Sequence, residues 1–296
     1  AYKDIHFTDD NTDYSKDLSL EEIKDYLFNK GISKNWNEPM TKEQVNRLKE
    51  TEARTIYNNI KATHNLVNIQ QVKGEDLEIN DKEHLTYLLT YSFPCQDISG
   101  AGKMAGFEDT STRSGMLWEV ERILKELKET DSLPQVLLME NVPQVHSVDN
   151  TPDFNKWQLE LIKLGYKNYW EDLIATDYGI PQTRNRCFMV SILGNYSYSF
   201  PPKKELKLKL IDLLEEKVGK KYFLSNRMKN YIFSKDDKYK VNEKSLQINR
   251  DIACTKTTRE GRTRADTSDY VGVIDSYNKK MTKMYSTWTP RSNQYS

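Results

Sequence analysis

The protein is a chain of 296 residues in which 44 Lys and Arg balance 44 Asp and Glu, so its formal net charge is zero. Its aromatic content of 11% excludes an intrinsically disordered chain, and its apolar runs fall well short of the roughly 18 residues of a membrane span. The first residues also lack the basic region and apolar core of a signal peptide. The cysteines are three in number, widely spaced and without a Cys-x-x-Cys pair. We therefore expect no disulfide framework, no metal site and a reducing, cytoplasmic environment.

The even charge balance conceals two unlike parts. Residues 1–195 contain 22 basic and 32 acidic residues, whereas residues 196–296 contain 22 basic and 12 acidic residues. The boundary lies near Pro201 and Pro202, a pair that interrupts regular structure. A basic third beside an acidic body is typical of a protein that binds a polyanion, although an exposed lysine-rich surface gives the same composition.

The first 80 residues read as polar helices. Ser19 and Glu22 have the spacing of a capping box, which predicts the start of a helix just before an apolar pattern. A second long helix is predicted over residues 42–66.

The next hundred residues alternate between apolar β-favouring runs and amphipathic stretches. This alternation predicts an α/β fold, with a parallel or mixed sheet and covering helices. Gly165 predicts the end of the second helix of this region. The predicted strands are Leu85–Phe93, Val136–Met139, Tyr169–Ile174 and Cys187–Ile192, and the predicted helices are Met116–Lys128 and Phe154–Leu164.

Three segments at predicted strand ends contain residue types that are common in active sites, namely a cysteine, a glutamate and a pair of arginines. They are Ser-Phe-Pro-Cys-Gln at residues 92–96, Glu-Asn-Val at residues 140–142, and Gln-Thr-Arg-Asn-Arg at residues 182–186. Ligands of open α/β sheets bind at the carboxyl ends of the strands. Each segment alone is weak evidence, because a lone Cys, Glu or Arg pair usually has a structural or solvent-exposed role.

Together the three segments suit one reaction. A cysteine protease is a poor fit, because neither His84 nor His146 stands in a hydrolase-like context near Cys95. A thiolate can instead add to C6 of a pyrimidine when a carboxyl such as Glu140 protonates N3 and an arginine such as Arg186 holds O2. The addition makes C5 electron-rich, so that C5 can accept a methyl group.

These residues resemble the catalytic motifs of DNA (cytosine-5) methyltransferases, in order and in spacing. The stretches Thr-Tyr-Ser-Phe-Pro-Cys-Gln-Asp at 90–97, Thr-Arg-Ser-Gly at 112–115 and Leu-Trp-Glu at 117–119 are similar to a bacterial and phage subgroup that includes the mycoplasma-type CpG enzymes. The resemblance is strong over residues 85–195 and weaker elsewhere. It implies a Rossmann-like mixed sheet with flanking helices, of the S-adenosylmethionine-dependent methyltransferase type. It also implies a catalytic domain at 1–195 and a smaller target-recognition region at 196–296.

The resemblance also implies roles for individual residues. Cys95 would attack C6, Glu140 would protonate N3, and Arg184 and Arg186 would orient the base, with Arg186 on O2. The residues implied to bind S-adenosylmethionine are Asn68, Ile69, Pro94 and Met116. The residues implied to contact DNA are Phe93, Gln96, Ser99, Arg113, Gln182, Arg259, Arg262 and Arg264.

Some family motifs are not found in the sequence. The Phe-x-Gly-x-Gly turn that holds the cofactor and the later Gly-Asn-Ser motif have no match. We therefore expect a sheet without its first strand, and weak binding or no binding of S-adenosylmethionine by this chain alone. Either a companion chain supplies the remaining motifs, or the sequence comes from a truncated gene. The segment 252–259 resembles the Thr-x-Thr motif that braces the target-recognition region.

The expected substrate is double-stranded DNA, with the target cytosine rotated out of the helix because its reacting atoms are unreachable inside the stack. Restriction-modification or phage self-protection is the expected setting, and no membrane is involved. Two alternatives stay open. One is an inactive relative that only binds DNA, and the other is an RNA cytosine-5 methyltransferase, because RNA enzymes also use a Pro-Cys nucleophile.

Overall fold

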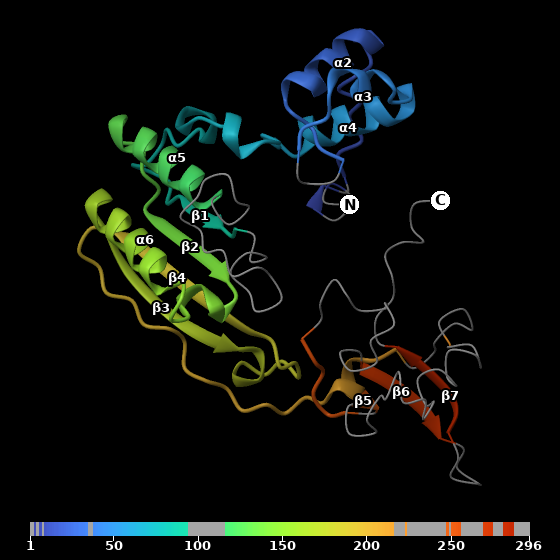
Figure 1. Cartoon of the computed structure of the whole chain (residues 1–296), viewed down its shortest axis with the longest axis vertical. Helices are drawn as coiled ribbons and strands as arrows, with labels where there is room; N and C mark the ends of the chain where they lie inside the picture. Colours follow the sequence, from blue (N-terminus) through green and yellow to red (C-terminus); the bar gives the residue numbers. More distant parts are fainter. Residues whose placement is uncertain are drawn as a thin grey trace.

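The structure of the protein is a computed structural model (Figure 1). It describes most of the first 215 residues and short parts of the remainder. The described residues are 3, 6–7, 9–34, 38–93, 116–215, 223, 247–248, 250–255, 269–274 and 281–286. In this part of the chain, no helix has both the length and the hydropathy needed to cross a lipid bilayer.

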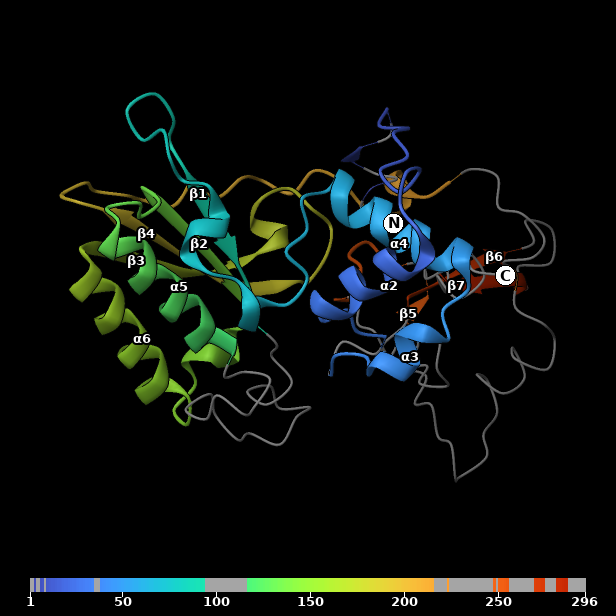
Figure 2. The ribbon, with the colours of Figure 1, turned by 90° about the horizontal axis from the view of Figure 1, so that it is seen from above.

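The chain begins with a helical unit made of α2 (Leu20–Asn29), α3 (Lys42–Asn46) and α4 (Glu50–Ala62). The predicted capping box is confirmed, because the Ser19 hydroxyl accepts from the Glu22 N–H while the Glu22 carboxylate accepts from the Ser19 N–H. The helices enclose an apolar cluster of their own. Figure 2 shows them grouped to one side of the larger sheet.

The single long helix predicted over 42–66 is wrong, because the chain turns between α3 and α4. Lys49 is extended, with φ −67° and ψ 151°, and starts α4 as its N-cap. The apolar positions explain the break. Leu48 and Tyr57 are nine residues apart, so one continuous helix would point them in opposite directions, whereas both pack in the same apolar cluster.

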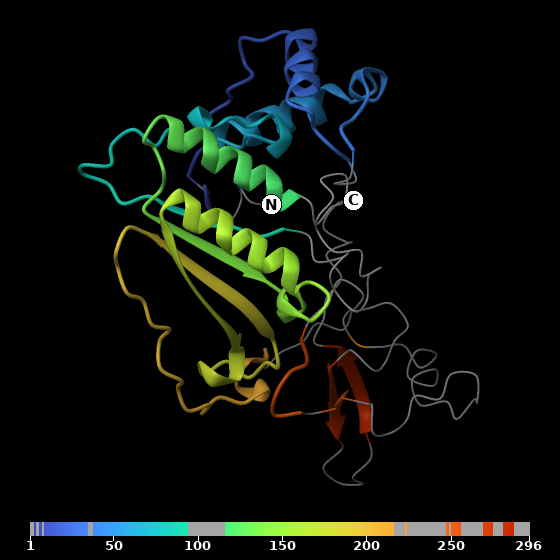
Figure 3. The same cartoon turned by 60° about the vertical axis from the view of Figure 1, so that its left-hand side comes forward.

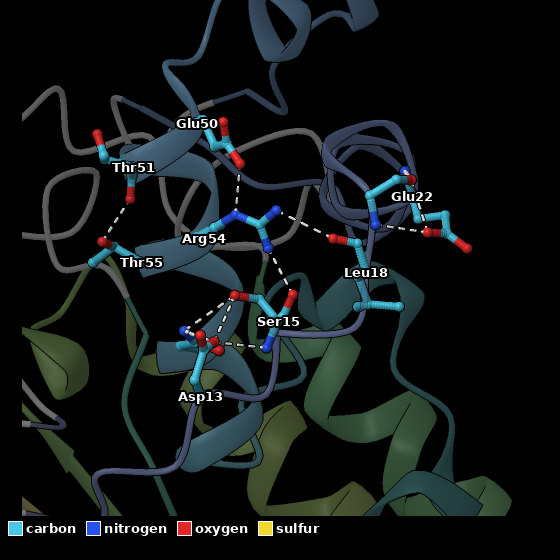
Figure 4. A network of polar contacts seen from close by, with 10 residues as sticks. Asp13, Ser15, Leu18, Glu22, Glu50, Thr51, Arg54 and Thr55 are labelled. Atoms are coloured by element: carbon cyan, nitrogen blue, oxygen red, sulfur yellow. Dashed lines mark hydrogen bonds and ion pairs between the residues drawn. The ribbon is translucent and has the colours of Figure 1, made fainter.

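Arg54 joins α4 to the segment that precedes α2 (Figure 4). Its guanidinium donates to the carbonyl oxygens of Ser15 at 2.6 Å and Leu18 at 3.2 Å, and pairs with Glu50 at 2.9 Å. In the same network Asp13 accepts from the Ser15 hydroxyl and from the Asn58 amide, and these hydrogen bonds lower the pKa of Asp13 to about 2.

Replacing Arg54 by lysine is expected to lower the free energy of unfolding by about 1–2 kcal/mol. An ammonium group cannot reach two carbonyls and a carboxylate in the planar geometry of a guanidinium, and hydrogen bonds to charged groups are worth more than neutral ones. Urea denaturation monitored by circular dichroism measures the change. Arg47→Lys, at an exposed position just after α3, is the matched control and should be nearly neutral.

The main sheet has the strand order β1-β2-β4-β3. β1 (Leu88–Tyr91) runs parallel to β2 (Val136–Asn141), and β4 (Asn185–Leu193) pairs antiparallel with both β2 and β3 (Tyr166–Ile174). The predicted mixed sheet is therefore confirmed. β1 is shorter than expected, because residues before it are held by other partners, such as the Gln135 side chain that accepts from the Tyr87 N–H at 2.8 Å.

Helices α5 (Leu117–Glu129) and α6 (Thr151–Leu164) cover one face of this sheet (Figure 3). The core lies between the two layers. Gly165 ends α6 with a φ of 107°, as the sequence predicts. The largest fully buried side chains of this core are Trp157, Tyr166, Phe154, Leu117, Leu124, Leu127, Leu137 and Met139.

Beyond β4 the described chain is largely without regular structure as far as η6 (Leu210–Leu213). A second sheet consists of the strands β5 (Gln247–Ile248), β6 (Asp269–Ile274) and β7 (Met281–Ser286) (Figure 1). β5 pairs parallel and β7 antiparallel with β6. These strands lie inside the predicted recognition region, whose boundary at 195/196 stays a prediction.

Candidate functional site

The Glu140 carboxylate lies between two arginines at the end of β2. Its Oε1 is 3.0 Å from Arg186 Nε and 3.4 Å from Arg184 Nη2. Its Oε2 accepts a hydrogen bond from the Ser92 hydroxyl at 3.3 Å. The structure thus brings together three of the four side chains predicted to carry the reaction, from segments more than 40 residues apart in the sequence.

The strand register explains this meeting. Glu140 pairs with Phe188 across β2 and β4, so Arg186, two residues from Phe188, lies on the same face of the sheet as Glu140. The neighbouring pair, Asn141 and Cys187, points to the opposite face and is buried under the helices. The Arg186 side chain is 18% exposed and that of Arg184 41%, so Arg186 is the more firmly enclosed.

Asn141 binds the backbone at Phe93, the last described residue before Cys95. Its Nδ2 donates to the Phe93 carbonyl at 3.2 Å, and its Oδ1 accepts from the Val142 N–H at 2.8 Å. The sequence motifs include Asn141 and Ser92 but predict no role for either residue. The only indication in the sequence is that Asn141 directly follows Glu140 and Ser92 directly precedes Phe93.

The loop before β4 is bound to a distant segment. Gln182 forms a bridge with Ala253, and Ala253 exchanges hydrogen bonds with the Pro181 carbonyl at 2.8 Å and the Thr183 N–H at 2.9 Å. The Gln182 amide also donates to the Cys254 carbonyl at 3.3 Å. The segment expected to brace the recognition region therefore touches the loop that ends in Arg184.

Three of the four residues predicted to bind the cofactor line one cavity of about 970 Å³. Asn68 and Ile69 stand at the start of η1 (Ile69–Gln71), and Met116 immediately precedes α5. The helical unit forms the other wall, in part through Gly31. Ligand cavities typically measure roughly 300–1,000 Å³, so this one has room for a nucleoside-sized group.

Several predicted site residues lie outside the described residues. They are Cys95, Pro94, Gln96, Ser99, Arg113, Arg259, Arg262 and Arg264.

Comparison with known proteins decides the family. The model of the C-5 cytosine-specific DNA methylase family matches residues 29–295. The chain belongs to this family. Enzymes of the C-5 cytosine methylase family use S-adenosylmethionine as the methyl donor, and the resemblance read from the motifs is confirmed.

Two curated relatives agree with this family. The orphan methyltransferase M.SssI of Spiroplasma monobiae is 39% identical over 249 residues, which are 83% of this chain and 62% of the relative. The type II methyltransferase M2.ScrFI of Lactococcus lactis is 37% identical over 231 residues, 75% of this chain and 61% of the relative. The chain thus spans about three-fifths of the length of these cytosine methylases.

Solved structures support the fold. The methyltransferase EhMeth of Entamoeba histolytica matches 75% of this chain and 65% of its own, with a TM-score of 0.54 and 17% identity. The Dnmt2 methyltransferase of S. pombe matches 76% of this chain and 66% of its own, with a TM-score of 0.50 and 19% identity. The predicted α/β methyltransferase fold of the C-5 cytosine methylases is confirmed.

Proposed function

We propose that the protein transfers a methyl group from S-adenosylmethionine to C5 of a cytosine in double-stranded DNA, through a covalent adduct between Cys95 and C6. The observation that carries this proposal is the contact between Glu140 and Arg186, at 3.0 Å, within a C-5 cytosine methylase. Asn141, next to Glu140, binds the carbonyl of Phe93, and Cys95 follows Phe93 by two residues.

The reaction begins when the Cys95 thiolate forms a bond to C6 of the extruded cytosine. The electron pair of the C5–C6 double bond moves toward C5, while the Glu140 carboxyl donates a proton to N3 and accepts from the exocyclic amine. C5 then takes the methyl group of the sulfonium donor, and the donor's sulfur leaves as a neutral thioether. Loss of the C5 proton to a base expels the thiolate and restores the double bond, and the N3 proton returns to Glu140, which frees the enzyme.

The arginines give this site its electrostatic character. Two guanidiniums face one carboxylate, so the cluster carries a net positive charge when all three groups are ionised. A guanidinium has five N–H donors, and Arg186 donates one of them, from Nη1, to the Asn185 carbonyl, while its Nε forms an ion pair with Glu140. Further donors can hold the cytosine O2, where negative charge grows as the thiolate adds.

The cavity beside η1 fits the cofactor. S-adenosylmethionine, when bound, supplies the electrophilic methyl group. Ile69, Met116 and Ile60 offer apolar walls for a flat base, and the Asn68 amide lies at the same cavity. The Asn68 Oδ1 is fixed because it accepts from the Gln70 N–H at 3.1 Å. We assign the adenosine end of the cofactor to these residues.

Replacing Gly31 by alanine is expected to weaken binding of S-adenosylmethionine about tenfold. Gly31 has a φ of 66°, and a Cβ there would lie 3.2 Å from Asn68 Nδ2, which must move. The left-handed backbone adds a cost of about 1–2 kcal/mol in stability. Titration calorimetry with S-adenosylmethionine measures the affinity.

Gly179→Ala is the matched control for this substitution. Gly179 has a φ of 82° and nothing within 4 Å of the added Cβ. It should lose similar stability and bind the cofactor normally. Equal affinities for both variants would contradict the assignment of this cavity.

Trapping of the covalent adduct tests the proposed function. DNA that contains 5-fluorocytosine cannot lose fluorine from C5, so the enzyme should remain attached after methyl transfer and survive denaturation. Cys95→Ser should abolish the adduct, and Cys254→Ser should retain it. DNA binding without any adduct would identify an inactive binder, and an adduct with RNA alone would exclude DNA as the substrate.

Release of tritium from C5 of labelled cytosine provides a second readout that needs no methyl donor. Addition of Cys95 to C6 allows C5 to take a proton from water, and elimination then exchanges the label. Exchange without methylation would locate a defect in cofactor binding and leave the role of Cys95 intact.

The recognition of DNA is assigned to residues 196–296. Its lysines would neutralise phosphates, and Arg259, Arg262 and Arg264 would read guanines through paired hydrogen bonds. We propose a role in restriction-modification or phage self-protection.

A further inference from the structure

Three side chains with different donor atoms meet on the face of the sheet opposite to Glu140. His146 ends η4 (Pro143–His146), Asp172 lies in β3, and Cys187 lies in β4. His146 Nε2 is 3.0 Å and 3.1 Å from the two carboxylate oxygens of Asp172. The nitrogen, oxygen and sulfur atoms all lie within 4.8 Å of one another.

The fold fixes these three groups independently of one another. Asp172 and Cys187 are directly paired across β3 and β4, so their side chains share a face. The carbonyl of His146 accepts from the Thr151 hydroxyl at 3.0 Å, which anchors η4 to the start of α6. The cluster therefore does not depend on one flexible loop.

The three side chains of this cluster differ in their exposure to solvent. Cys187 is fully buried, whereas the His146 and Asp172 side chains are 26% and 30% exposed. The Trp170 ring lies 4.7 Å from the His146 ring and 5.4 Å from the ring of Phe154. An ion can reach the cluster past the partly exposed His146 and Asp172 side chains.

A nucleophilic role for Cys187 does not fit this arrangement. Burial, and next Asp172, raise the pKa of the Cys187 thiol to about 12, so the group is a protonated thiol beside a carboxylate. The imidazole pairs with the carboxylate and not with the thiol, unlike a cysteine–histidine catalytic pair.

We propose that His146, Asp172 and Cys187 bind a divalent transition metal ion of the zinc class. Imidazole, carboxylate and thiolate are the ligands that Zn²⁺ prefers, and bonds of about 2.0–2.3 Å hold tetrahedral ligand atoms a little over 3 Å apart. The observed spacing reaches this geometry with small side-chain adjustments. On binding, the metal replaces the thiol proton, which passes to solvent, and water completes the coordination.

The ion would stabilise the end of the sheet that carries the reaction centre. Cys187 directly follows Arg186, and His146 lies six residues after Glu140. A metal bound to both, and to Asp172, would tie the ends of β2, β3 and β4 together behind the Glu140 carboxylate. The proposed site is thus structural, because it lies on the face of the sheet opposite to Glu140.

Titration of the whole chain with Co²⁺ under reducing conditions tests the proposal. Coordination by Cys187 should produce a thiolate-to-cobalt charge-transfer band that saturates at one ion per chain, and Zn²⁺ should displace it. Cys187→Ser should remove the band. His146→Gln and Asp172→Asn should each weaken Co²⁺ binding at least about tenfold, comparable to the loss seen when a metal site loses a supporting group.

Controls separate this site from the other thiols and histidines. His84 forms a similar pair with Asp81, at 2.7 Å, but is exposed. His84→Gln, Cys254→Ser and Cys95→Ser should all retain the band. Zn²⁺ in hundredfold excess over its dissociation constant should also raise the Tm by about 5 °C or more, and this increase should vanish in His146→Gln.

The proposal is overturned by any of three results: no thiolate band at millimolar Co²⁺, a band that survives Cys187→Ser, or a band that only Cys95→Ser removes. Circular dichroism of Cys187→Ser checks that the buried substitution leaves the protein folded. If it does not, the partly exposed His146→Gln variant decides the outcome alone.

Discussion

Replacing Glu140 by glutamine is expected to lower the rate of cytosine methylation about a hundred- to ten-thousandfold. A carboxyl can give a proton to N3 of the base, whereas an amide cannot, and positioned proton transfer is worth this range. The charged contact with Arg186 at 3.0 Å is lost as well. Single-turnover transfer of a labelled methyl group to DNA isolates the chemical step, and loss of tritium from C5 reports on the addition alone.

Glu171→Gln is the matched control for this experiment. Glu171 lies on the same face of the sheet, because it pairs with Phe188 as Glu140 does, but it is exposed to solvent. This variant should keep normal rates. A Glu140→Gln enzyme that adds to C6 at the normal rate would show that N3 receives its proton from another group.

Replacing Arg186 by alanine is expected to lower the same rate about a hundred- to a thousandfold. Removing one donor that stabilises growing negative charge has an effect of this size. Arg184→Ala should be milder, because its contact with Glu140 is longer, at 3.4 Å, and its side chain is more exposed. Both rates are read from the same single-turnover assay, with far-ultraviolet circular dichroism to verify folding.

A conservative variant distinguishes geometry from charge. Arg186→Lys keeps the positive charge but cannot contact Glu140, the Asn185 carbonyl and the base at once. We expect it to recover only a small part of the lost rate. Full recovery, or a larger loss in Arg184→Ala than in Arg186→Ala, would contradict the assignment of Arg186 to the cytosine O2.

The sequence predicted the meeting of Glu140 with Arg184 and Arg186 because their motifs stand at strand ends. A period of two along each strand then places Glu140 and Arg186 on one face. The role of Asn141 was not predictable in the same way. Its hydrogen bond to the Phe93 carbonyl depends on the register of β1 against β2, and neither strand's sequence alone predicts that register.

Long-range register also explains the other omissions. Asp172 and Cys187 are 15 residues apart in an unremarkable stretch, and only the pairing of β3 with β4 brings them together. In the helical unit, the local sequence pattern predicted one helix where the structure has two. The run from Lys42 has helical composition throughout, but Leu48 and Tyr57 pack in one apolar cluster, which a continuous helix would not allow because they are half a helical turn out of phase.

The hydrogen bonds of Ala253 with Pro181 and Thr183 couple the segment at residues 250–255 to the backbone just before Arg184. Ala253 belongs to the short segment between β5 and β6 of the second sheet, and its partner Thr183 lies one residue before Arg184. A force applied to residues 250–255 is therefore transmitted through two backbone hydrogen bonds to the residue beside this arginine. If the proposed function holds, binding of DNA by the second sheet and placement of the Arg184 guanidinium at the base would be coupled, and a sequence that fits the second sheet poorly would place this guanidinium less well.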